Sequence, residues 1–191
     1  MEQHKIAQPL GYFTLNLPQE LLDLVVKEVN SIEYASYQEA QLGTLDNPVI
    51  ETKTRNSKVH WWYEQHWVSS LFCHYFNKAN RDLWEYDLTY LQGIQVTKYE
   101  EGDKYDWHSD YGTESDNNHT RKLSASLLVS DESDYEGGDF EFIDYHGRTV
   151  TAPKEKGTII LFDSRIPHRV TPVTKGTRIS LVTWMLGPKL R

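Results

Sequence analysis

The sequence predicts a mostly β protein of the jelly-roll type, with helices confined to its N-terminal part. Two amphipathic helical patterns occur before Asp87, and only short runs of β-branched and aromatic residues follow it, separated by polar or glycine-containing turns. We predict strands at about 91–100, 105–110, 122–130, 138–143, 147–152, 158–163, 168–173 and 178–186. Eight short strands are typical of a jelly roll.

The two helical patterns predict N-terminal elements that flank the β region. Pro18 opens the first, because the N–H that proline lacks has no partner in the first turn of a helix. Apolar residues then recur at helical spacing: Leu21, Leu22, Val25, Val26 and Val29. The second pattern, within 61–83, places such residues at Val68, Leu71, Phe72, Tyr75, Phe76, Ala79 and Leu83. Between them, about Ser31 to Lys58 is polar and aperiodic, which predicts a long excursion.

Glycine marks three of the turns that the predicted strands require. Gly137-Gly138, His146-Gly147 and Lys156-Gly157 stand between strands. Glycine accepts positive φ angles without steric cost, so these positions suit hairpin turns.

Length and composition predict one globular domain. The chain has 191 residues, of which 38% are hydrophobic and 13% aromatic, enough for a sizeable core. We expect a single domain over 1–191, with helical support over about 1–90 and a β core over about 91–187. Cys73 is the single cysteine, so no intramolecular disulfide can form, and its apolar neighbours predict an inert core position.

The charge balance and the absence of apolar spans narrow the partners. A formal net charge of -8 gives no basic footprint for a phosphate backbone, which disfavours nucleic acid. No stretch reaches the roughly 18 apolar residues of a membrane span, and the first residues do not resemble a secretion signal. We expect a cytoplasmic protein whose partners are proteins or small molecules.

Three residues are candidate metal ligands. His108 and Asp110 are two apart, so on a strand both side chains emerge on the same face. His168 opens a later predicted strand. Two imidazoles and one carboxylate on one side of a metal leave positions open for a chelating cosubstrate and O2, which suits Fe(II) in oxygenases. An isolated pair of this spacing with a distant histidine is nevertheless a weak signal.

Arg178 strengthens the metal hypothesis. It lies ten positions after His168 and is predicted to begin a strand that also carries Ile179 and Leu181. Its planar fork can hold a carboxylate with two parallel hydrogen bonds. A part-buried arginine needs an anion, so a carboxylate-bearing cosubstrate is favoured over a surface ion pair.

With these residues the sequence resembles the prolyl 4-hydroxylase-like branch of the Fe(II)/2-oxoglutarate-dependent dioxygenases, including the PKHD-type hydroxylases. The resemblance covers about Leu91 to Leu186 and rests on several pieces in order. These are Tyr99, Gly102, Tyr105, His108 and Asp110, then Arg121 and Ser124, Tyr135 with Gly137-Gly138-Asp139, Lys156-Gly157, His168 with Val170 and Pro172-Val173, Gly176 with Arg178, and Trp184.

The resemblance implies a double-stranded β-helix (jelly roll, cupin-like) with His108, Asp110 and His168 on iron. It implies Fe(II), 2-oxoglutarate and O2 as cofactor and cosubstrates, with ascorbate as a candidate reductant. Arg178 would bind the distal carboxylate of 2-oxoglutarate, and Tyr99 and Ser124 would line the same pocket. Leu128 departs from the pattern, because some relatives have a cosubstrate-binding tyrosine there.

The predicted function is hydroxylation of a prolyl or other residue in a polypeptide, with release of succinate and CO2. Two alternatives stay open: an oxygenase acting on a free amino acid, another small metabolite or a nucleobase, and a catalytically silent cupin-like sensor of metal or ligand. Arg178 argues against the sensor, because a metal-only site has no use for an arginine directed at a dicarboxylate.

The other polar and aromatic candidates receive simpler interpretations. We expect no metal role for His4, His60, His66, His74, His119 and His146. The cluster Trp61, Trp62, Tyr63, His66 and Trp67 favours core packing over a substrate platform, while Arg55 and Lys58 beside it could border a peptide groove. The acidic segment 111–118 is either a lid or a solvated loop, and segments 44–60 and 111–120 are expected to govern substrate choice.

Overall fold

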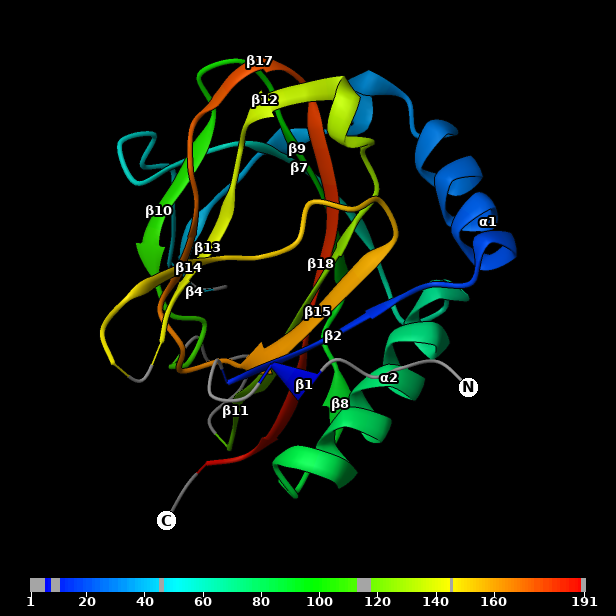
Figure 1. Ribbon diagram of the computed structural model, residues 1–191, viewed down its shortest axis with the longest axis vertical. Coiled ribbons are helices and arrows are strands. Elements are labelled where there is room, and N and C mark those ends of the chain that lie inside the picture. Colours follow the sequence, from blue (N-terminus) through cyan, green and yellow to red (C-terminus); the bar gives the residue numbers. More distant parts are fainter. Residues whose placement is uncertain (1–5, 8–10, 45–46, 113–117, 145, 190–191) are drawn as a thin grey trace.

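The computed structural model of the protein describes residues 6–7, 11–44, 47–112, 118–144 and 146–189. Two α-helices, α1 (Gln19–Asn30) and α2 (Val68–Leu83), lie in the N-terminal half (Figure 1). The strands are β1 (Ile6–Ala7), β2 (Tyr12–Asn16), β3 (Gln38–Glu39), β4 (Leu42–Thr44), β5 (Asn47–Val49), β6 (Arg55–Asn56), β7 (Lys58–Trp62), β8 (Tyr90–Leu91), β9 (Ile94–Tyr99), β10 (Lys104–His108), β11 (His119–Leu128), β12 (Tyr135–Gly137), β13 (Phe140–Ile143), β14 (Thr149–Thr151), β15 (Thr158–Asp163), β16 (His168–Val170), β17 (Val173–Gly176) and β18 (Arg178–Pro188). Short 3-10 helices span Tyr34–Ser36 and Glu132–Asp134.

Two antiparallel sheets form the body of the molecule. The larger has the order β1-β2-β15-β11-β18-β9-β7-β3, with β8 also paired to β18. The smaller has the order β14-β13-β16-β10-β6. The structure is mostly β, and strands that are distant in sequence are neighbours in both sheets. Together with the two helices, this confirms the predicted jelly-roll class with flanking N-terminal helices.

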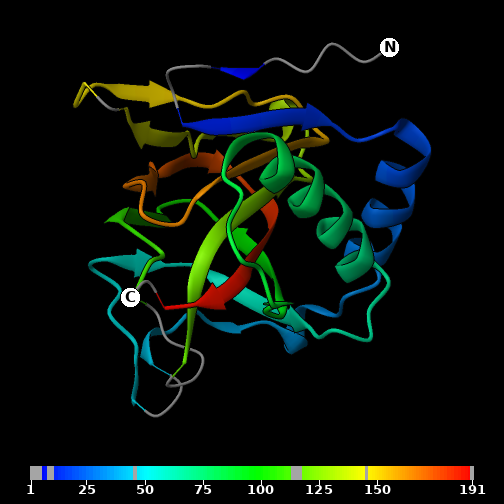
Figure 2. The same ribbon diagram turned by 90° about the horizontal axis from the view of Figure 1, so that it is seen from below.

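The larger sheet separates two hydrophobic cores. On one face α1 and α2 pack against it, as Figure 2 shows, through residues such as Val25, Phe72 and Phe76 together with Leu161 and Leu181. On the other face a second core joins the two sheets and contains aromatic side chains: Tyr12, Tyr99, Tyr135, Phe140, Phe142 and Phe162. This aromatic core surrounds the cavity described below, so the fold places a polar site within apolar walls.

The structure corrects several boundaries in the N-terminal half. The segment 61–67, expected within the second helix, instead contributes Trp61 and Trp62 to β7, and the helix begins at Val68. No strand was predicted before residue 91, yet β2 pairs with β15 and β7 pairs with β9. The N-terminal part therefore extends the larger sheet as well as supporting it. The reason is that a strand is stabilised by partners distant in sequence, which local periodicity does not report.

Smaller differences occur in the β region. The stretch predicted as one strand at 168–173 is interrupted at Thr171 and Pro172, which separate β16 from β17. β16 belongs to the smaller sheet, whereas β17 pairs with β12. The predicted segment 105–110 ends as a strand at His108. A 3-10 turn at Glu132–Asp134, with Asp131 as its N-cap, interrupts a region where only strands were expected.

The position of Cys73 and the character of the two helices concern two expectations drawn from the composition. Cys73 is partly buried against the helix-side core, and burial raises the pKa of its thiol, which fits an unreactive position. Neither helix in the described ranges combines the length and apolar character needed to cross a membrane.

Candidate active site

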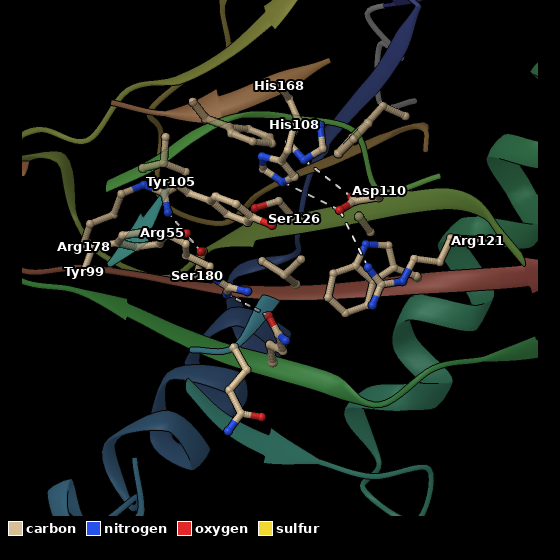
Figure 3. Close-up of a pocket in the computed structure, with 18 residues that line it drawn as sticks. Arg55, Tyr99, Tyr105, His108, Asp110, Arg121, Ser126, His168, Arg178 and Ser180 are labelled. Carbon is tan, nitrogen blue, oxygen red and sulfur yellow. Dashed lines mark hydrogen bonds and ion pairs between the residues drawn. The ribbon is translucent and has the colours of Figure 1, made fainter. Parts of the chain in front are cut away.

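A cavity of about 160 Å3 lies between the two sheets and is lined by strands of both. Figure 3 shows His108, His168 and Asp110 pointing toward one another on one side, with Arg55, Tyr99 and Arg178 on the other. The apolar part of the wall includes Phe140, Phe162 and Val170 from the aromatic core. Polar groups that converge in an apolar cavity are typical of a ligand or active site.

Strand register brings the two histidines together. His108 ends β10 and His168 begins β16, and the two residues are direct partners in the antiparallel pairing. Asp110 follows the end of β10, where its backbone N–H donates to the carbonyl of Ser164 (2.9 Å). One ligand atom from each of the three residues lies within 4.8 Å of the others. Asp110 Oδ1 is 3.7 Å from His108 Nε2, and Asp110 Oδ2 is 3.5 Å from His168 Nε2.

Backbone hydrogen bonds leave the Nε2 atom of each imidazole available as a ligand. His108 Nδ1 lies 2.8 Å from the carbonyl of Asp106, and His168 Nδ1 lies 2.9 Å from that of Ile166. A carbonyl only accepts, so Nδ1 of each ring carries a proton, and in the neutral form of the ring Nε2 keeps its lone pair. The two rings are thus oriented as metal-binding histidines commonly are.

The charge state of the triad suits a divalent cation. Burial, together with the neighbouring His168, lowers the pKa of His108 to about 3, so His108 is neutral near pH 7. Burial alone would raise the pKa of Asp110, but His168 and Arg121 outweigh it, and the pKa falls to about 2. Two neutral imidazoles and one ionised carboxylate are the donor set that Fe(II) accepts, so the residues present fit that metal.

A second set of contacts holds Asp110 and the histidines in place. Ser124 Oγ donates to Asp110 Oδ2 (2.8 Å) and lies 2.9 Å from Ser164 Oγ. Arg121 Nη1 is 3.8 Å from Asp110 Oδ1, and its guanidinium lies 3.6 Å from the centre of the Trp184 ring. The Tyr105 ring stacks on His108, with centroids 3.5 Å apart.

Arg178 is the buried cation across the cavity from the triad. It begins β18 beside Tyr99 of β9, and its side chain is 3% exposed. Nη1 donates to Ser180 Oγ (3.0 Å), while the buried Nε has no hydrogen-bond partner. Within the described parts of the chain no carboxylate lies within 4.0 Å of this guanidinium. An unmatched buried arginine that faces a metal site fits the distal carboxylate of 2-oxoglutarate.

Tyr99, Ser124 and Leu128 have different positions relative to the cavity. Tyr99 lines it, and the Arg178 guanidinium lies 5.6 Å from its ring centre. Ser124 is fully buried behind the wall, where it contacts Asp110. Leu128 packs in the aromatic core. Its side chain has no hydroxyl, so it cannot replace the tyrosine that some relatives have there.

Sequence reasoning assigned no site role to several residues that line the cavity: Gln41, Gln95, Tyr105, Arg121, Ser126 and Ser180. Arg121 and Tyr105 did belong to the residues that carry the family resemblance, and this was the one sequence feature that pointed to them. Arg55, expected at the border of a groove, is instead buried in the cavity wall, whereas Lys58 forms an ion pair with Glu100.

The remaining candidates lie elsewhere. His66 stacks on Trp62 with centroids 4.1 Å apart, and His60 contacts the carbonyl of Ser36. Among the residues that the structure describes, the one cluster able to hold a metal is His108, Asp110 and His168. His4 lies outside the described ranges, as do 45–46 of the segment 44–60 and 113–117 of the acidic segment.

The fold and the three converging side chains are typical of the class of jelly-roll proteins that bind a divalent metal through two histidines and one carboxylate. The sequence model of the 2OG-Fe(II) oxygenase superfamily matches residues 94–186, which contain all three of these residues and Arg178. Over that region the chain is similar to the 2OG-Fe(II) oxygenase superfamily, whose name implies Fe(II) and 2-oxoglutarate.

Among curated proteins the similar ones are PKHD-type hydroxylases. The chain is 36% identical over 96 residues to one from Synechococcus sp. (strain CC9902), an alignment that covers 50% of this chain and 41% of the relative. It is 34% identical over 90 residues to one from Shewanella oneidensis, covering 46% of this chain and 40% of the relative. The match thus spans about two fifths of these relatives' length.

Solved structures of similar fold cover nearly the whole chain. A prolyl-4-hydroxylase from Pseudomonas putida superposes with a TM-score of 0.72 at 19% identity, covering 93% of this chain and 92% of the other. A Trichoplax adhaerens prolyl hydroxylase, solved with a peptide fragment of the hypoxia inducible factor oxygen degradation domain, gives 0.76 at 21% identity, covering 93% and 84%. At this identity the likeness establishes the fold.

Proposed function

We propose that the protein is a 2-oxoglutarate-dependent Fe(II) hydroxylase. The observation that carries the proposal is the pairing, within one cavity, of the His108, Asp110 and His168 triad with the unmatched Arg178. A module that only bound metal would not need a buried arginine on the opposite wall. The geometry therefore favours the oxygenase over the silent sensor.

Each side chain has a distinct task in this proposal. With Fe(II), 2-oxoglutarate and O2 bound, the cofactor set supplies oxidative decarboxylation to succinate and CO2, coupled to insertion of one oxygen atom into a C–H bond. His108, Asp110 and His168 would hold the metal, since one ligand atom from each lies within 4.8 Å of the others. Arg178 binds the distal carboxylate of 2-oxoglutarate, and Tyr99 lines the same cavity. Phe140 and Phe162 limit the access of water.

We further propose that the hydroxylated group belongs to a polypeptide, with proline as the leading candidate. The two solved structures described above are prolyl hydroxylases, and one of them was solved with a peptide. The net charge of -8 disfavours nucleic acid as the substrate. The cytoplasmic location expected from the sequence and ascorbate as reductant belong to the same proposal.

The test combines turnover with product analysis. Iron-loaded protein, 2-oxoglutarate and O2 are incubated with proline-rich peptides, with free amino acids and with short oligonucleotides. We expect succinate release in all cases, and a gain of about 16 mass units in the peptides alone, since one oxygen atom enters the substrate.

The His168→Ala variant is the matched control and should release no succinate. Absence of succinate from the iron-loaded wild-type protein would overturn the oxygenase assignment. Oxygen gain in a free amino acid or an oligonucleotide, but in no peptide, would overturn the polypeptide assignment while leaving the oxygenase intact.

A further inference from the structure

Arg55 is a second buried arginine of the cavity wall, and neither the triad nor the 2-oxoglutarate site uses it. It lies on β6, the edge strand that pairs with β10 in the smaller sheet. Its side chain is 7% exposed and lines the cavity (Figure 3). The exposed Gln41 also lines this cavity, so the cavity is open to solvent at that point.

Among the described residues, the hydrogen-bond partners of the Arg55 guanidinium are neutral. Nε donates to Ser57 Oγ (3.1 Å), and Nη2 donates to Gln95 Oε1 (3.1 Å). Its central carbon lies 4.6 Å from the centre of the Tyr105 ring, which in turn stacks on the metal-ligand candidate His108. Over the described ranges no carboxylate comes within 4.0 Å of Arg55, and Nη1 has no hydrogen-bond partner. An arginine stays charged in proteins, so this charge is buried without a counter-ion.

The charges around the cavity indicate what would match Arg55. Three arginines line it, at positions 55, 121 and 178, and Asp110 is the one acidic residue among the described lining. Arg121 lies beside Asp110, and Arg178 faces the proposed 2-oxoglutarate site. With Fe(II) and 2-oxoglutarate bound, the metal and the three arginines bring five positive charges, and Asp110 and the two carboxylates bring three negative ones. The cavity therefore keeps a net positive charge. A cavity with a net positive charge favours an anionic ligand.

We propose that Arg55 binds a carboxylate of the primary substrate. The proposal rests on the proposed function, because the use of Arg178 for 2-oxoglutarate is what leaves Arg55 for a second anion. A carboxylate suits the planar fork, because no described residue accepts a hydrogen bond from Nη1. Through the stack of Arg55, Tyr105 and His108, a group bound here lies near the metal site. The source is either an acidic side chain next to the target residue of a peptide or the carboxylate of a free amino acid.

The experiment compares acids with amides of the same shape. Protein saturated with Mn(II) and 2-oxoglutarate does not turn over and has Arg178 occupied. Into it we titrate two matched pairs by calorimetry: acetyl-Pro-Asp-amide against acetyl-Pro-Asn-amide, and L-proline against L-prolinamide. We expect the acid of one pair to bind at least about tenfold more tightly than its amide. A preference in the first pair assigns the carboxylate to a peptide side chain, and one in the second assigns it to a free amino acid.

Variants then attribute the preference to Arg55. Arg55→Gln should abolish the acid preference while 2-oxoglutarate and Mn(II) still bind. Arg55→Lys should keep part of it, because a point charge cannot reproduce the fork. Arg81→Gln is the matched control on α2, where Arg81 is exposed and pairs with its neighbour Asp82, and it should keep the full preference.

Three results would overturn the proposal: no acid preference in either pair with the wild-type protein, a preference that persists in Arg55→Gln, or, should that variant not fold, equal acid affinity in wild type and Arg55→Lys. These outcomes are separate from failure of the proposed function. A protein that releases no succinate but shows an Arg55-dependent acid preference would refute the oxygenase and keep the anion site. An active oxygenase without that preference would refute the anion site alone.

Discussion

At the scale of single residues, hydrogen bonds around the triad decide how its ligand atoms are aimed. The carbonyls of Asp106 and Ile166 hold the two histidines with Nε2 toward the cavity. Ser124 holds the Asp110 carboxylate, because the Ser124 hydroxyl donates a hydrogen bond to Oδ2. Such supporting contacts commonly tune metal affinity without touching the metal.

We therefore predict that Ser124→Ala weakens Mn(II) binding by about 10–100-fold, the usual effect of losing a supporting hydrogen bond at a metal site. Calorimetric titration of Mn(II) measures the change. Ser126→Ala is the matched control two residues along β11, since Ser126 lines the cavity and forms no hydrogen bond to the triad. Equal affinities for wild type and Ser124→Ala would show that Asp110 is positioned by its backbone alone.

Arg178→Ala should weaken 2-oxoglutarate binding by roughly 2–5 kcal/mol, the range for removing one partner of a buried charge pair. Metal binding should persist, because Arg178 lies across the cavity from the triad. Arg178→Lys should be milder, since lysine keeps the charge and loses the bidentate fork. The measurement is titration of 2-oxoglutarate into Mn(II)-loaded protein. Unchanged affinity in Arg178→Ala would assign this arginine a structural role.

At the scale of elements, the site depends on how the ends of strands are held. β17 ends at Gly176, and β18 begins two residues later at Arg178, so the turn between them orients the cavity arginine. Gly176 has φ +78°, and a Cβ there would lie 2.1 Å from the carbonyl oxygen of Asp134. Both the backbone conformation and the close approach of the 3-10 helix that precedes β12 require glycine at this position.

The comparison of Gly176→Ala with Gly147→Ala separates these two requirements. Gly147 has φ +74° with open space around it, so alanine there should lower the free energy of unfolding by about 1–2 kcal/mol, the cost of a left-handed backbone. Gly176→Ala should lower it by about 1–3 kcal/mol more, because the new methyl group meets backbone. Urea unfolding midpoints measure both changes. Equal losses would mean that the turn moves to accommodate the methyl group.

At the scale of the whole molecule, the triad joins residues that are distant along the chain but lie on or next to two adjacent strands of the smaller sheet. His108 and His168 come from different strands, and His168 packs against Phe162 and Phe140, with ring centroids 4.7 and 5.6 Å away. A metal held by all three residues requires the folded arrangement, because the ligands are distant in sequence. Metal binding should therefore stabilise the entire fold.

We predict that Mn(II) at a hundred times its dissociation constant stabilises the protein by about 2.7 kcal/mol. For a chain of this length that raises the melting temperature by roughly 5–10 °C, at about 2–4 °C for each kcal/mol. Thermal denaturation followed by circular dichroism, with and without Mn(II), measures the shift. His168→Ala should show none. A similar shift in that variant would place the Mn(II) site elsewhere.

The sequence by itself determined the fold class and the members of the triad. Short runs of β-branched and aromatic residues after Asp87 predict strands from the local sequence. The residue types and spacing of His108, Asp110, His168 and Arg178 indicate their chemistry. Their convergence could be expected because the predicted strands belong to one fold. Tyr99 was likewise expected at the pocket, and it lines the cavity.

Only the tertiary structure decided what the N-terminal half contributes. Trp61 and Trp62 continue an apolar run into a helix, yet pairing with Gln95 and Ile94 of β9 makes them a strand. Arg55 lies in a polar, aperiodic stretch, and its burial follows from the pairing of β6 with β10. Strand pairing and burial depend on partners that are distant along the chain, so no local pattern could reveal that a charged residue of this stretch lines the cavity.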